Sequence, residues 1–319
     1  MSEPNSKLPN LSTKIEEFIS TMESQNLEPL YKISPQKARE FLDNIQKNNP
    51  INIDAEVKDT NIFVEGVGTI DLQVVRPINS FDRLPVILYL HGGGWIMGGK
   101  DSYERLIKQL AVKCNCSVIF VDYNKAPEYQ YPKALEQIFA VLDYLTKYPQ
   151  EFNIDKQKIS IVGDSAGGNM ATVIALKAKL ANLNIEKLCL LYPVTNAEMD
   201  TKSYNNFNDG PWLTKKAMEY FFDAYIPNKK LRKDPFVSPL FIDEDDLIGF
   251  PKTLVLTAEN DVLRDEGEAF ASKLDSAGVD VLSIRVNGAI HDFLMLNPLA
   301  DTFQAKWVLN FICEFLTAN

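Results

Sequence analysis

The chain has 319 residues, 45% of them hydrophobic, which is enough to bury one large core. Its 43 acidic and 33 basic residues give a formal net charge of -10, which argues against nucleic acid or an anionic membrane surface as a partner. We therefore expect one α/β domain with additions rather than two independent domains.

The polar start MSEPNSKLPN has no apolar signal core, and no later apolar run approaches the ~18 residues of a membrane span. Of the four cysteines, Cys114 and Cys116 lie too close along a predicted strand to bridge each other. Ordinary buried thiols in a reducing compartment explain them best. The sequence predicts a cytoplasmic protein with no membrane segment.

Two amphipathic helices are predicted at the N-terminal end. Thr13 and Glu16 form a capping box, and Ser34 followed by Pro35 marks a second helix start. The apolar faces comprise Ile15, Phe18, Ile19 and Met22, and then Ala38, Phe41, Leu42 and Ile45. We expect residues 1–50 to be a helical cap segment packed on a catalytic domain at 51–319. A partner-binding module is the alternative.

After residue 50 the hydrophobic period changes to that of strands. Stretches 55–64 and 67–76 are predicted to pair antiparallel at one sheet edge. Further apolar strands are predicted at 86–90, 116–123, 158–163, 187–193, 253–259 and 279–286. Helical stretches are predicted at 102–113, 132–147, 166–180, 265–277 and 301–316. This alternation predicts a mostly parallel eight-stranded sheet with helices on both faces, with the site at the carboxyl ends of the strands.

The connection between the strands at 187 and 253 is unusually long, and we expect a lid or cap insert at about 197–245. One helix is predicted inside it, from Thr214 to about Tyr225. Its aromatic residues suit a pocket roof, but some are expected to form the insert's own core instead. That expectation applies to Phe221, Phe222 and Tyr225.

The stretch GDSAG at 163–167 stands between a predicted strand and a predicted helix. In that setting G-x-S-x-G is typical of a nucleophile elbow, with Ser165 exposed on a strained turn above a helix N-terminus. A glycine-rich turn with a surface serine, or a phosphate loop, would show the same five residues.

A serine nucleophile needs a base and a carboxylate to orient that base. His291 follows the last predicted strand, at the sheet end that also holds the serine, whereas His91 opens the glycine loop HGGGW and is expected to anchor it. Asp261 follows a strand end and is the favoured carboxylate, with Asp265, Glu266 and Glu259 as rivals. The order serine, aspartate, histidine is the order of an α/β hydrolase.

Four motifs together resemble the hormone-sensitive-lipase-like family (family IV) of bacterial esterases, from about residue 85 onward. They are HGGGW at 91–95, GDSAGGN at 163–169, DVLRDEG at 261–267 and HDF at 291–293. The resemblance implies an α/β-hydrolase fold with a helical cap and substrates that are short-chain or aryl esters. It also implies an oxyanion hole from the N–H groups of Gly93, Gly94 and Ala166. YNKAPE at 123–128 departs from the common YRLAPE, which affects local packing and no catalytic group.

The sequence thus predicts a serine carboxylesterase that works through an acyl-enzyme and needs no metal or organic cofactor. The expected partner is a small-molecule ester, and a homodimer is possible. An amidase or arylformamidase, or a non-catalytic binding protein on the same fold, are the alternatives. The aromatic residues expected at the substrate pocket are Trp95, Phe207, Trp212 and Phe293.

Overall fold

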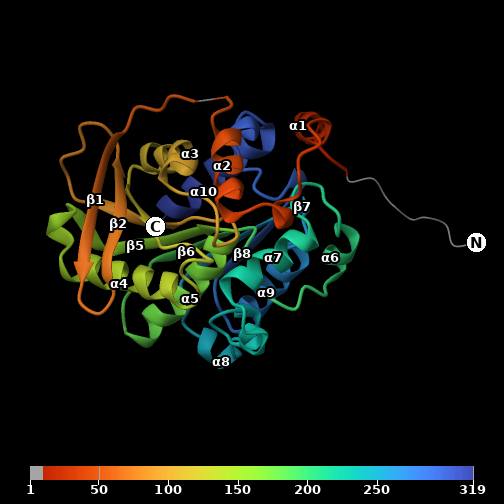
Figure 1. Ribbon diagram of the computed structural model, residues 1–319. Coiled ribbons are helices and arrows are strands. Elements are labelled where there is room, and N and C mark those ends of the chain that lie inside the picture. Colours follow the sequence, from red (N-terminus) through yellow and green to blue (C-terminus); the bar gives the residue numbers. More distant parts are fainter. Residues whose placement is uncertain (1–9, 50, 319) are drawn as a thin grey trace, which may run out of the picture.

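The computed structural model describes residues 10–49 and 51–318, so most of the predicted polar start lies outside it. Its eight strands are β1 (Glu56–Val64), β2 (Gly68–Arg76), β3 (Leu84–Leu90), β4 (Ser117–Asp122), β5 (Ile154–Asp164), β6 (Lys187–Leu191), β7 (Lys252–Asn260) and β8 (Val281–Ile290). They form one sheet in the order β1-β2-β4-β3-β5-β6-β7-β8 (Figure 1). Strand β2 pairs antiparallel with β1 and β4, and the other neighbours are parallel. The predicted mostly parallel sheet is confirmed.

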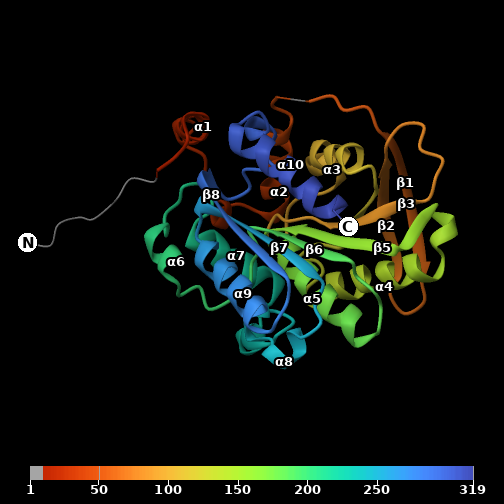
Figure 2. The ribbon, with the colours of Figure 1, turned by 180° about the vertical axis from the view of Figure 1, so that it is seen from behind.

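The middle of the sheet is buried on both faces, which is why its strands are continuously apolar. Strand β6 is buried along its whole length, and so is the second half of β5. The edges are β1 and β8, which lie on opposite sides of the molecule (Figure 2). The hairpin of β1 and β2 closes at Gly66 and Gly68, both with positive φ, as the sequence predicts.

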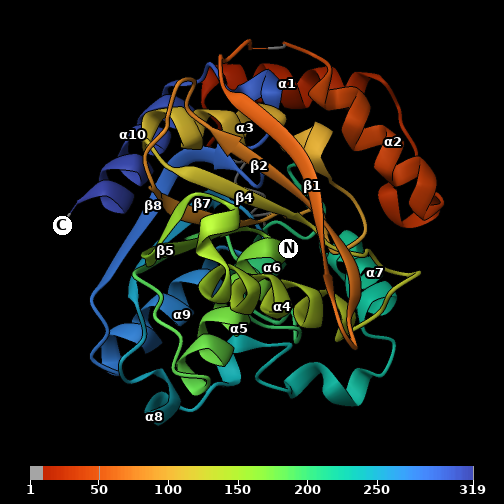
Figure 3. The same cartoon turned by 90° about the vertical axis from the view of Figure 1, so that its left-hand side faces the viewer.

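Helices cover both faces of the sheet (Figure 3). One face carries α3 (Lys100–Lys113) and α10 (Phe303–Thr317). The other carries α4 (Lys133–Lys147), α5 (Ala166–Leu180) and α9 (Arg264–Ser276). Short 3-10 helices are η2 (Pro149–Glu151) and η5 (Asn297–Leu299). No helix among the described residues is long and apolar enough to cross a membrane.

The N-terminal helices are α1 (Thr13–Ser24) and α2 (Pro35–Gln46), with η1 (Leu30–Lys32) between them. The predicted start of α2 is confirmed, since the Ser34 hydroxyl accepts a hydrogen bond from the Lys37 N–H at 3.3 Å. The capping box at Thr13 is wrong. The N-cap is Ser12, whose side chain makes no capping bond, while its N–H donates to the Gly288 carbonyl and ties α1 to β8.

The long insert between β6 and β7 contains α6 (Lys202–Asn206), α7 (Lys215–Tyr225), η3 (Lys229–Lys233), η4 (Pro239–Phe241) and α8 (Glu244–Leu247). Helix α7 starts where the sequence predicts, because the Thr214 hydroxyl accepts from the Ala217 N–H at 3.1 Å. Helix α7 contacts η1 of the N-terminal segment. The insert and the N-terminal helices therefore meet over the carboxyl ends of the strands.

Candidate active site

Ser165 occupies a strained turn between β5 and α5. Its backbone has φ 53° and ψ -119°, a conformation that side chains other than glycine rarely adopt. A Cβ at Gly163 would overlap the carbonyl of Gly167, and a Cβ at Gly167 would overlap the carbonyl of Leu90. The two glycines of G-x-S-x-G are therefore required for strand and helix to pack this closely, and the turn holds Ser165 at the N-terminus of α5.

Three side chains form one continuous chain of hydrogen bonds. The His291 Nε2 atom lies 2.8 Å from the Ser165 Oγ, and its Nδ1 lies 2.7 Å from an Asp261 carboxylate oxygen. Asp261 follows β7 and His291 follows β8, so both stand at the same sheet end as Ser165. An ionised carboxylate only accepts, which places the imidazole proton on Nδ1 and leaves Nε2 to accept the serine proton.

Asp261 is held in place by the Leu263 N–H, which donates to its other oxygen at 3.0 Å. Its rivals are engaged elsewhere. Asp265 accepts from the Ser203 N–H at 2.7 Å, Glu266 from the Thr195 N–H at 2.6 Å and Glu259 from the Gly288 N–H at 2.7 Å. None of these three carboxylates is hydrogen-bonded to His291, so the geometry singles out Asp261.

The electrostatic surroundings of His291 favour its charged form. Burial lowers the pKa, but the charges of Asp261 and Asp292, the Asp261 hydrogen bond and the charge of Asp164 outweigh it and raise the pKa of His291 to about 9. A base with a raised pKa takes a proton readily once it is neutral.

His91 has a different environment from His291. Its Nδ1 donates to the carbonyl of Gly92 at 2.8 Å, and its ring stacks on Tyr123 with 4.2 Å between the centroids. Burial, helped by the charge of Lys125, lowers the pKa of His91 to about 3. His91 is thus a neutral side chain that contacts the glycine loop, and it makes no hydrogen bond to Ser165.

The glycine loop turns its backbone toward the serine. Gly93 and Gly94 have φ of 92° and 61° and line the same cavity as Ser165. Within the described ranges, the N–H groups of Gly93, Gly94 and Ala166 donate to no protein acceptor. Free N–H groups at a helix N-terminus and in an adjacent loop are suited to bind a negative oxygen.

Asp164, which was not among the predicted site residues, is hydrogen-bonded to this loop. Its carboxylate accepts from the Gly92 N–H at 3.1 Å and from the hydroxyls of Tyr89 and Tyr103 at 2.9 and 2.7 Å. Burial and the charge of Asp292 raise its pKa to about 7, although these three hydrogen bonds oppose the rise. Its position directly before the serine in GDSAG is the one sequence feature that could have indicated a role in the site.

Arg39 links the N-terminal helices to the glycine loop. From α2, its guanidinium donates to the carbonyl of Ile96 at 2.9 Å, to that of Ala126 at 3.1 Å and to both oxygens of Glu128. In the unusual YNKAPE segment, Lys125 pairs with Asp122 at 2.6 Å and does not enter the cavity. At Lys125 the departure from YRLAPE therefore changes a local ion pair and not the lining of the cavity.

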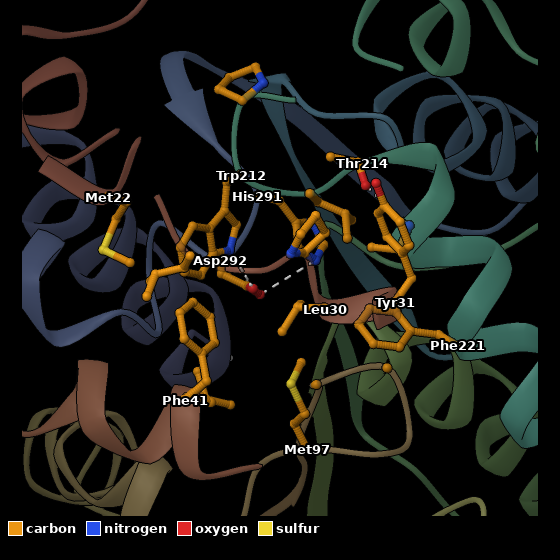
Figure 4. Close-up of a pocket in the computed structure, with 18 of the residues that line it drawn as sticks. Met22, Leu30, Tyr31, Phe41, Met97, Trp212, Thr214, Phe221, His291 and Asp292 are labelled. Atoms are coloured by element: carbon orange, nitrogen blue, oxygen red, sulfur yellow. Dashed lines mark hydrogen bonds and ion pairs between the residues drawn. The ribbon is translucent and has the colours of Figure 1, made fainter. Parts of the chain in front are cut away.

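A cavity of about 530 Å³ opens above Ser165 and His291. Its walls come from both N-terminal helices, η1, the glycine loop and the insert (Figure 4). The labelled apolar side chains around it are Met22, Leu30, Tyr31, Phe41, Met97, Trp212 and Phe221. A largely apolar cavity that ends at a nucleophile suits a small organic substrate.

Of the four aromatic residues expected at the pocket, Trp212 lines the cavity, with its ring 5.4 Å from Phe18 and 6.2 Å from Phe41 between centroids. The other three do not, which corrects the expectation. Trp95 is buried and stacks on Tyr225, and Phe207 packs against Arg264. Phe293 is buried and packs on Tyr192, whose ring also contacts His291.

Two further wall residues were not anticipated. Phe221, expected in the core of the insert, lines the cavity and fits against Gly94 so closely that a Cβ there would overlap its ring. Asp292 also lines the cavity, and Trp212 donates its Nε1–H to it at 3.0 Å. Both positions depend on contacts between distant segments, which the sequence alone does not specify.

Within residues 10–49 and 51–318, no group of three His, Cys, Asp or Glu side chains is arranged to hold a metal ion. The acidic and imidazole groups near Ser165 are instead joined to one another by the hydrogen bonds described above.

The fold and this site define an α/β hydrolase, and a family model described as "alpha/beta hydrolase fold" matches residues 87–295. The chain belongs to the hormone-sensitive-lipase-like (family IV) carboxylesterases of that superfamily, and it is a carboxylesterase. This confirms the family and the reaction class predicted from the sequence.

Three relatives illustrate the match. An esterase of Gibberella moniliformis is 36% identical, over 86% of this chain and 87% of its own, and an arylesterase of Saccharolobus solfataricus is 34% identical, over 81% and 83%. The crystal structure of a thermostable esterase from Pseudomonas putida is 40% identical and covers 98% of both chains with a TM-score of 0.95.

Proposed function

We propose that the protein hydrolyses short-chain or aryl carboxylic esters through an acyl-enzyme on Ser165. The observation that carries this proposal is the unbroken hydrogen-bond chain from Ser165 through His291 to Asp261, at the floor of a largely apolar cavity. The arylesterase among the relatives supports aryl esters as substrates.

In the first half-reaction, His291 Nε2 takes the Ser165 proton while Oγ attacks the ester carbonyl. The N–H groups of Gly93, Gly94 and Ala166 stabilise the oxyanion, and each such donor contributes about 10²- to 10³-fold in rate. The carbon–oxygen bond to the alcohol then breaks, and the protonated His291 gives its proton to the leaving oxygen. Asp261 stabilises the imidazolium in between.

In the second half-reaction, water replaces the alcohol. His291 takes a proton from the water as its oxygen attacks the acyl carbon, and the same N–H groups bind the second oxyanion. Collapse breaks the bond to Ser165, which recovers its proton, and the carboxylic acid leaves. No proton or electron is gained or lost over the cycle.

The test is a panel of p-nitrophenyl esters with acyl chains of about two to twelve carbons, measured on the wild type and on Ser165→Ala. Turnover that Ser165→Ala abolishes, together with labelling of Ser165 by a fluorophosphonate, supports the proposal and argues against a non-catalytic binding protein. A matched anilide or aryl formamide that is hydrolysed faster than the aryl ester would instead make the protein an amidase or arylformamidase.

The location we propose is the cytoplasm. All four cysteines are free and buried, as expected for thiols in a reducing compartment. The possible homodimer remains a prediction, which the mass in solution by light scattering would test.

A further inference from the structure

A carboxylate stands beside the catalytic base inside the cavity. The Asp292 Oδ1 atom lies 3.4 Å from the His291 Nε2, while the Oδ2 accepts the hydrogen bond from Trp212 Nε1–H (Figure 4). The Asp292 side chain is 19% exposed and lines the catalytic cavity. Neither the proton transfers nor the binding of the oxyanion uses this group.

Asp292 and its hydrogen-bond partner both have a left-handed backbone conformation. The φ of Asp292 is 63°, and that of Trp212 is 68°. Glycine adopts this conformation freely and aspartate tolerates it better than most residues, whereas a bulky tryptophan there is strained. Strain of this kind persists where the surrounding structure enforces it, often at functional sites. A charged side chain kept at such a position, and fixed by its neighbour, points to a role in the cavity.

The chemistry of the reaction locates this carboxylate relative to the substrate. His291 Nε2 must give its proton to the leaving alcohol oxygen, which therefore comes within about 3 Å of that nitrogen. Because Asp292 Oδ1 is 3.4 Å from the same nitrogen, it lies at most about 6 Å from the leaving oxygen. Asp292 is thus close enough to the leaving oxygen to interact with a charge on the alcohol part of the ester.

Most of the other charged side chains of the cavity wall are also acidic. Glu23, Glu28 and Asp209 also line the cavity, and Lys216 is the one lysine or arginine among its described lining residues. Unit charges about 6 Å apart near a protein surface change a rate by about three- to hundredfold, depending on the effective dielectric constant. A charge on the alcohol part of the ester will therefore interact strongly with Asp292 and change the rate.

Building on the proposed esterase function, we propose that Asp292 sets the specificity for the alcohol part of the ester. It disfavours esters whose alcohol carries a negative charge and favours those whose alcohol carries a positive charge. The substrate class this defines is short-chain esters of neutral or cationic alcohols.

The experiment compares three acetate esters: acetylcholine, its neutral isostere 3,3-dimethylbutyl acetate, and the anionic acetate ester of 3-hydroxypropanoate. The quantity measured is the ratio of kcat/KM for each charged ester to that for the neutral one. This ratio cancels any change in the protonation of His291, because all three esters use the same base. We expect Asp292→Asn to lower the cation ratio and raise the anion ratio, each by about tenfold.

Asp209→Asn is the matched control, since it removes the same charge from an exposed position on the cavity wall. It should change either ratio by less than about threefold. If Asp292→Asn does not fold, Asp292→Gly removes the charge in a residue suited to the positive φ.

Ratios that stay the same without the Asp292 carboxylate would overturn the proposal, and so would an equal effect of Asp209→Asn. A wild type that fails to hydrolyse even the neutral ester would refute the proposed esterase function instead.

Discussion

The pH dependence of activity offers the sharpest test of the site, because one group, His291, sets its main inflection. In the proposed mechanism His291 must be neutral to take the Ser165 proton, and its surroundings raise its pKa to about 9. At a pKa of about 9, roughly one hundredth of His291 is neutral at pH 7. We therefore expect kcat/KM to rise about tenfold per pH unit from neutral pH and to level off above about pH 9.

Replacing Asp292 by asparagine should move this curve to lower pH. The substitution removes a negative charge 3.4 Å from Nε2, while Asp261 keeps its hydrogen bond to Nδ1. For a partly exposed group at an effective dielectric constant of about 40 to 80, that charge contributes about 1.2 to 2.4 kcal/mol. At 1.36 kcal/mol per unit of pKa, the midpoint falls by about one to two pH units. Activity toward a neutral ester at pH 7 should rise accordingly.

The assay is pH-stat titration of a neutral alkyl ester from about pH 5 to 10, with hydroxide-catalysed hydrolysis subtracted. The pKa of His91 is lowered to about 3, so this second histidine stays neutral over the whole range. Asp164, with its pKa raised to about 7, can add an inflection below the main one. A wild-type midpoint below pH 7, or a midpoint that Asp292→Asn leaves in place, would refute the reasoning.

Three further predictions concern the groups around the substrate. Ser165→Ala and His291→Ala should each lower kcat by about 10⁶-fold while the circular dichroism spectrum stays native, and a larger loss in a folded His91→Ala would contradict the choice of base. Gly94→Ala should lower kcat at least tenfold, because the new methyl group must displace the Phe221 ring from the cavity wall; an unchanged kcat would contradict the close packing of Phe221 on Gly94. The wild type should prefer acyl chains of about two to six carbons, and Trp212→Ala should move the optimum to longer chains; a wild-type preference for about twelve carbons would contradict this cavity.

The main features of the site could be predicted because they depend on local geometry. A strand that runs into GDSAG and then into a helix favours a sharp turn at Ser165, and in the structure neither Gly163 nor Gly167 has room for a Cβ. Parallel strands end at the same side of the sheet, which brings the residues after β7 and β8 to the serine. Asp261 and His291 therefore followed from strand order and residue type.

The walls of the cavity could not be predicted in the same way, because the direction of a side chain depends on backbone conformation and distant packing. Trp95 has φ 59°, and its ring stacks on Tyr225 of α7 rather than lining the cavity. The sequence predicts Phe221 in the insert's own core, because helical periodicity does not tell which neighbour a buried face meets. In the structure that neighbour includes Gly94 of the glycine loop.

Three residues with a strained backbone lie close to the reaction. Ser165, Trp212 and Asp292 all have positive φ, and each such conformation costs on the order of 1–3 kcal/mol in a residue other than glycine. Contacts with the surrounding fold offset this free-energy cost. The N–H of Ser165 donates to the carbonyl of Leu191 in β6. The Trp212 ring packs against α1 and α2, and its Nε1–H donates to Asp292. The N-terminal helices and the insert therefore do more than cover the site. They hold in place the ring that fixes the carboxylate beside His291, so a change in their packing should alter the pH profile and the alcohol specificity together.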